Sequence, residues 1–194
     1  MSNYIYPEIL AADSGVAGTL FNTYTTAKTV LPAGGIPNGN TPTMVPGFWT
    51  INRKIRWTLW GAISNIVTTP GTLTLQFMLG SIAAFSSGAL QLSSTAHTQA
   101  PFKAEFMGTC RAVGSGTSAN IMGQWLVTSQ AISATAVADS TTSHNSLLGP
   151  ATAPAVGTGF DSTVATIMDF WAGFSISNAG NGIQIQQHLL ESWT

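Results

Sequence analysis

The side chains that could bind a metal ion are few and widely spaced. The three histidines, His97, His144 and His188, lie in different segments, and no His-x-x-x-His or Cys-x-x-Cys pair is present. A protein zinc site is typically built from such closely spaced ligands. His188 is the candidate for a site formed by three copies at a symmetry axis, but a polar residue at a sheet edge is the preferred interpretation. We therefore expect no metal and no cofactor.

The acidic residues do not predict a catalytic pair. Glycoside hydrolysis needs two carboxylates that flank the scissile bond, which Glu105 could form with Asp169 or with Glu191. Nothing in the spacing selects one pair among the seven acidic residues. No Gly-x-Ser-x-Gly elbow or phosphate-binding glycine loop is present, and the single cysteine, Cys110, is interpreted as a small buried hydrophobe. We predict no enzyme activity, and a glycan depolymerase is only a third hypothesis.

The composition points to a surface that contacts other proteins. Charged residues make up 7% of the 194-residue chain, against about a quarter in typical soluble domains, and the net charge is −1. Six basic residues are too few for a nucleic-acid-binding surface. No apolar segment reaches the roughly 18 residues of a membrane-spanning helix, so we expect no membrane partner. The first residues lack the features of a secretion signal, which predicts synthesis in a cytoplasm.

Alternating apolar and polar residues predict three β-hairpins. The stretch 54–79 places Ile55, Trp57 and Leu59 on one face, breaks at a Thr-Pro-Gly turn, and then resumes the alternation. The stretches 102–129 and 163–193 show the same period on both sides of glycine-rich turns. Each hairpin needs a second layer to cover its apolar face.

The remaining segments complete the prediction of an all-β fold. We predict residues 1–18 to be an N-terminal arm or irregular lead-in, and residues 19–194 to form a single domain. Residues 81–100 are interpreted as a surface excursion with one short strand, and residues 130–159 as a long loop. Without an amphipathic helix, the pattern predicts an antiparallel β-sandwich of about seven to eight strands, of jelly-roll type because of its long loops.

Three stretches carry a resemblance to a known class of proteins. They are PGFWTINRKIRWTLWGAISNIVTTPGTLTLQFMLGS, FKAEFMGTCRAVG and SISNAGNGIQIQQHLLESW, within residues 46–193. This succession of turns and strands resembles the jelly-roll virion proteins of tailed bacteriophages, which look like tumour-necrosis-factor-type trimers. The resemblance implies a structural virion protein, assembled in the host cytoplasm as a homotrimer. Because the chain lacks the long N-terminal shaft of fibre proteins, we expect a decoration or cementing protein bound to the major capsid protein.

The tryptophans and basic residues provide the candidate interface. Trp57 and Trp125 fall on the predicted core faces, whereas Trp60 and Trp171 fall on the opposite faces. Tryptophan is enriched at protein interface hot spots. The candidate subunit or capsid interface consists of Trp60, Met78, Trp171, Arg56, Lys103 and Arg111. The alternative is a receptor- or glycan-binding tip of a phage fibre or spike, in which these tryptophans form a sugar platform.

Overall fold

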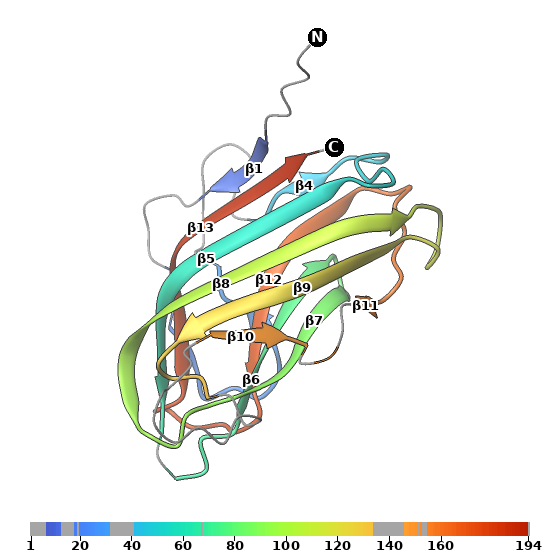
Figure 1. The fold of residues 1–194 in the computed structure, drawn as a ribbon. Helices are drawn as coiled ribbons and strands as arrows, with labels where there is room; N and C mark the ends of the chain where they lie inside the picture. The colour runs from blue at the N-terminus through green and yellow to red at the C-terminus, as the bar shows by residue number, and fades with distance from the viewer. Residues whose placement is uncertain are drawn as a thin grey trace.

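The computed structural model is a sandwich of two antiparallel β-sheets. It describes residues 7–12, 18, 20–31, 41–66, 68–133, 146–150, 152 and 155–193, and these residues form strands and turns without a helix. Figure 1 shows the long strands of one sheet crossing in front of the strands of the other. The β-sandwich predicted from the sequence is therefore confirmed.

The larger of the two sheets, called the large sheet below, contains eight strands. From edge to edge they are β1 (Glu8–Ala12), β13 (Gly182–Trp193), β5 (Lys54–Asn65), β8 (His97–Ala112), β9 (Asn120–Ser129) and β10 (Ser146–Gly149). Two short strands extend it, β2 (Phe21–Asn22) beside β13 and β11 (Ala155–Val156) beside β9. Strand β1 lies within the predicted lead-in.

The other sheet, called the small sheet, contains five strands. They are β3 (Lys28–Thr29), β12 (Thr166–Phe174), β6 (Thr72–Leu79) and β7 (Ile82–Gln91), with β4 (Thr43–Met44) also pairing with β12. The two sheets place their apolar faces against each other. The core includes Trp57 and Trp125 from the large sheet and Phe77 and Phe170 from the small sheet, all fully buried.

The alternation along β5 correctly predicts the apolar residues that are buried, although Thr58, predicted on the opposite face, is also only 5% exposed. Ile55, Trp57 and Leu59 are completely inaccessible to solvent, whereas Lys54 and Trp60 are exposed. Because successive side chains of a strand point to opposite sides of the sheet, every second residue reaches the core. A fully buried large apolar side chain contributes about 1.5–3 kcal/mol relative to an exposed one, so this face holds the strand in the sandwich.

Two of the three predicted hairpins are wrong. Strands β5 and β6 belong to different sheets, because β5 pairs with β13 and β8, whereas β6 pairs with β12 and β7. In the same way, β12 lies in the small sheet and β13 in the large sheet. The chain thus crosses between the sheets after residues 65 and 174, and the apolar faces meet across the core. Alternation shows which face of a strand is apolar. Two strands of opposite sheets that pack across the core show the same pattern as two strands that pair within one sheet.

The hairpin predicted within residues 102–129 is confirmed by the pairing of β8 with β9, from Phe102 opposite Ser129 to Ala112 opposite Asn120. The surface excursion predicted for residues 81–100 is wrong, since β7 occupies most of its first half. The pairing of β6 with β7 shifts register twice, which interrupts the alternation and hides the strand. Within the predicted loop 130–159, β10 and β11 extend the large sheet, while residues 134–145 lie outside the described residues.

Candidate functional site

The structure brings no metal-binding group of residues together in the part that it describes. No cluster of three or more His, Cys, Asp or Glu side chains suited to a metal ion occurs among these residues. His188 lies in the core with 1% of its surface exposed, and its Nδ1 accepts a hydrogen bond of 3.3 Å from Trp57 Nε1. The sheet-edge interpretation of His188 is therefore wrong, because β13 lies between β1 and β5. His144 is outside the described residues.

The three candidate carboxylates lie apart. Glu105 is on β8 of the large sheet and Asp169 is on β12 of the small sheet, and both side chains point away from the core between the sheets. Glu191 is on β13, two strands from β8, and its Oε2 is bound by Arg56. The pairings considered for glycoside hydrolysis thus receive no support from the fold.

Cys110 is buried, as predicted. Its burial raises the pKa of the thiol, although a hydrogen bond to the Ala112 carbonyl and the nearby Arg53 act in the opposite direction. A thiol with a raised pKa forms little thiolate, the reactive species, at neutral pH. Cys110 therefore fits a packing role.

The surface of the large sheet that faces away from the small sheet, called the outer face, carries most of the candidate interface residues. Trp60 of β5 is 38% exposed and lies between Gln187 of β13 and Lys103 of β8. Arg56 lies on the same face of β5, and Arg111 is exposed at the end of β8. These four of the six candidates thus share one sheet.

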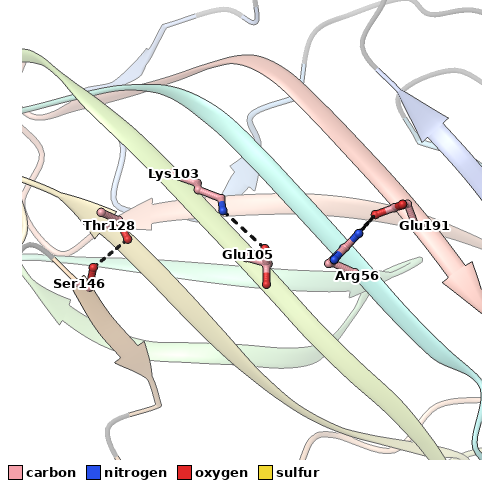
Figure 2. A network of polar contacts seen from close by, with 6 residues as sticks. All are labelled: Arg56, Lys103, Glu105, Thr128, Ser146 and Glu191. Atoms are coloured by element: carbon pink, nitrogen blue, oxygen red, sulfur yellow. Dashed lines mark hydrogen bonds and ion pairs between the residues drawn. The ribbon is translucent and has the colours of Figure 1, made fainter. Parts of the chain in front are cut away.

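Four charged groups in the middle of the outer face form two pairs within the chain, as Figure 2 shows, and Lys54 at the start of β5 and Arg111 near the end of β8 are further cations on this face. Arg56 Nε and Nη2 donate to Glu191 Oε2 at 2.9 and 2.7 Å. Lys103 Nζ lies 3.6 Å from Glu105 Oε2. The exposed Lys103–Glu105 pair contributes only about 0–1 kcal/mol to folding, whereas the Arg56–Glu191 pair is partly buried, with Glu191 only 6% exposed. Together the two pairs leave the middle of this face without net charge. This middle part of the face can approach another neutral surface without electrostatic repulsion.

An exposed apolar group on the outer face was missed by the sequence interpretation. It consists of Met107, Leu126, Leu148 and Val156, which are between 40% and 55% exposed, and is called the apolar patch. Leu126 of β9 lies directly opposite Leu148 of β10, and Val156 of β11 opposite Met122 of β9. The alternation in the sequence predicted that Met107 and Leu126 point away from the core. The sequence therefore indicated two of the four residues of the patch. Leu148 and Val156 come from the predicted loop.

The other two candidates, Met78 and Trp171, lie on the small sheet. Met78 is 3% exposed, so it does not offer a free surface in this structure. Trp171 is half-buried, and its Nε1 donates to Asp169 Oδ2 at 2.6 Å. Asp169 Oδ1 also accepts hydrogen bonds from Thr29 Oγ1 and from the Phe170 amide. The six candidates therefore divide between the outer surfaces of two sheets and do not form one surface.

Asp169 should make the stability of the fold depend on pH. Burial raises the pKa of its carboxyl above the ordinary 3.8, outweighing the three hydrogen bonds that lower it. The folded state consequently binds this proton more tightly than the unfolded state does. The stabilisation that the carboxyl contributes is fully present below the unfolded pKa and is lost as pH rises through the folded pKa. We expect this loss of unfolding free energy to disappear in Asp169→Asn, measured by urea unfolding at a series of pH values.

Asp161 provides the control for this experiment because its pKa shift has the opposite sign. Hydrogen bonds from Thr163 Oγ1, Gly116 N and Thr163 N lower the pKa of its exposed carboxyl. The stabilisation from this carboxylate is present above the unfolded pKa and lost as pH falls through the folded pKa. Asp161→Asn should therefore change the slope of the stability profile only on the acid side. An unchanged pH profile in Asp169→Asn would contradict the assignment.

Comparison with known proteins identifies no relative: no family model, curated protein or solved structure matches the chain. Among the described residues there is also no helix long and apolar enough to cross a membrane.

Proposed function

We propose that this chain is a structural protein of a bacteriophage virion, a capsid decoration or cementing protein whose subunits associate through the outer face of the large sheet. The observation that carries the proposal is the apolar patch beside internally paired charges. Scattered apolar residues are normal on a protein surface, but contiguous ones mark interaction sites. Leu126 and Leu148 are direct cross-strand neighbours, so these two members of the patch adjoin each other. The sequence resemblance to jelly-roll virion proteins supplies the virion setting.

A second copy of the chain fits this face. The charges in the middle of its central strands, Arg56, Lys103, Glu105 and Glu191, are of both signs and balance, whereas Lys54 and Arg111 add positive charge at one end of β5 and β8. The middle of an identical face is therefore neither attracted nor repelled strongly, and burial of the apolar side chains provides the driving force for association. A homotrimer is the closed assembly that the resemblance implies. The low charge of the whole chain supports extensive contact between subunits.

Charge introduced on the outer face should disrupt assembly more than folding. Trp60→Lys and Leu126→Lys each place an unpaired ammonium where apolar surface would be buried, which costs several kcal/mol per ion. We expect the thermal unfolding midpoint of each variant to stay within a few degrees of the wild-type value. The oligomer mass measured by native mass spectrometry and sedimentation should fall. Ala89→Lys, at an exposed position of β7 on the small sheet, is the matched control. An unchanged oligomer mass in both outer-face variants, or a monomeric wild type, would refute this interface.

The exposure of Trp60 also favours a second candidate, a glycan-binding tip of a fibre or spike. An accessible indole ring beside the polar Gln187 and Lys103 is a suitable platform for a sugar ring. Trp171 is a weaker candidate because its indole N–H is already bound to Asp169. Glycan-array binding that Trp60→Ala abolishes would support this alternative. Immunogold labelling of intact particles separates the two functions, because decoration predicts label on the shell and a spike predicts label on the tail.

A further inference from the structure

Three loops meet at one end of the sandwich, called the tip below. They are residues 45–53 before β5, residues 113–119 between β8 and β9, and residues 160–165 before β12. Figure 1 shows these segments in cyan, yellow-green and orange at the same end of the sheets. The described residues include all three loops without a gap.

Hydrogen bonds join the three loops into one unit. Ser162 N donates to the Gly114 carbonyl at 3.0 Å, and Gly114 N donates to Ser162 Oγ at 2.8 Å. Gly47 N donates to the Ser162 carbonyl, and Gly116 N donates to Asp161 Oδ2. Ser162 is 4% exposed, so the junction is protected from water. The loops are thus held in fixed relative positions, which lowers the entropy cost of binding a partner.

The tip presents aliphatic side chains to solvent. The side chains of Val45, Ile51, Val113 and Val164 are between 41% and 68% exposed. Val45 is the most exposed large hydrophobic residue among those described. The aromatic residues below them are not presented in this way. Trp49 is buried against Phe160, with 5.4 Å between ring centroids. Four β-branched or small aliphatic residues on a preorganised surface favour insertion into an apolar groove.

Basic residues lie close in the chain to two of these aliphatic residues, Ile51 and Val113. Arg53, Lys54 and Arg111 are half of the six basic residues of the chain, and all three adjoin the tip. The Arg53 guanidinium lies over the Phe48 ring, 4.4 Å from its centroid. The only carboxylate within the three loops, Asp161, already accepts hydrogen bonds from Gly116 and Thr163. The tip therefore has a net positive charge beside its apolar centre.

We propose that the tip docks into an apolar groove bordered by carboxylates on a neighbouring virion protein. Charge complementarity selects the partner, since Arg53, Lys54 and Arg111 meet acidic side chains while Ile51 and Val164 enter the groove. A lipid surface fits less well, because membrane-interface segments present Trp and Tyr, and the exposed tip residues here are aliphatic. The inference rests on the proposed structural role but uses the loops at the end of the sandwich, and it shares only Lys54 and Arg111 with the outer face.

A random twelve-residue peptide library displayed on phage tests the proposal with the full-length chain as bait. Peptides retained by the wild type and rejected by the double variant Ile51→Asp/Val164→Asp should be enriched in Asp or Glu together with Leu, Ile, Val or Phe. A synthetic peptide of the consensus should bind Arg111→Glu at least about tenfold more weakly than the wild type, as expected for loss of a charged interface contact. The binding should weaken as salt is added.

The outcomes separate this inference from the proposed self-association. Leu126→Lys should reduce the oligomer mass but still bind the consensus peptide. Ile51→Asp/Val164→Asp should have the oligomer mass of the wild type but no longer bind the peptide. Enrichment of basic peptides, absence of enrichment, or equal binding of the peptide by the tip variant would overturn the tip proposal. Wild-type binding to phosphatidylglycerol vesicles, abolished by the tip substitutions and without any selected peptide, would reassign the tip to a membrane.

Discussion

Replacing Trp57 with alanine should lower the free energy of unfolding by about 3–5 kcal/mol, the range for truncation of a buried aromatic residue. Trp57 is fully buried and extends from β5 of the large sheet toward two rings of the small sheet. Its ring centroid lies 6.0 Å from that of Phe77 and 6.4 Å from that of Phe170. The variant therefore leaves a cavity where the sheets meet, and guanidinium unfolding followed by fluorescence of the remaining tryptophans measures the cost.

Two matched variants separate the components of this effect. Trp60→Ala, three residues along the same strand, removes an exposed indole and should change the free energy of unfolding by only about 0.5 kcal/mol, as for most surface substitutions. Trp57→Phe keeps an aromatic ring but removes the N–H that binds His188 Nδ1, which should cost about 1–3 kcal/mol. Equal destabilisation by Trp57→Ala and Trp60→Ala would contradict the assignment of opposite faces.

The sequence predicted the faces of the strands better than their partners. Alternation correctly separated Trp57 and Trp125 from Trp60, because side-chain direction follows a local period of two residues. It failed to show that β5 and β6 belong to opposite sheets, since pairing depends on hydrogen bonds to strands distant in sequence. Strand β13, which pairs with β5, begins more than a hundred residues later. No local sequence pattern indicates a pairing partner so far along the chain.

The candidate site was predicted only in part, for the same reason. Trp60 and Lys103 were placed on outward faces, and the structure makes them neighbours on adjacent strands. Leu148 and Val156 lie in a segment rich in small residues, where too few positions alternate to indicate a strand. The tip was not predicted, because its aliphatic residues come from three loops that only the folded chain brings together. Single exposed valines carry no signal in sequence until their neighbours are known.

Gly61 occupies the point where β5 comes closest to the backbone of β13. A Cβ atom at this position would lie 2.0 Å from the Gln184 carbonyl oxygen and 3.0 Å from its carbonyl carbon. Both are backbone atoms, and the adjacent register shift between Ile185 and Gln187 fixes them by the pairing on either side. Glycine inside a strand is typical of such a close approach or of a β-bulge. The residue is therefore required by the path of the neighbouring strand.

Gly61→Ala should consequently destabilise the fold by at least about 1–3 kcal/mol, the usual cost of atoms added to a packed region, because β13 has to move away from β5. The reverse substitution at the next residue, Ala62→Gly, should cost only about 0.5–1 kcal/mol through backbone entropy. Hydrogen exchange adds a local readout, since amides of β13 around the bulge should lose protection in Gly61→Ala and keep it in Ala62→Gly. If Gly61→Ala unfolds at the wild-type denaturant midpoint with unchanged protection, the close approach of these two strands is incorrect.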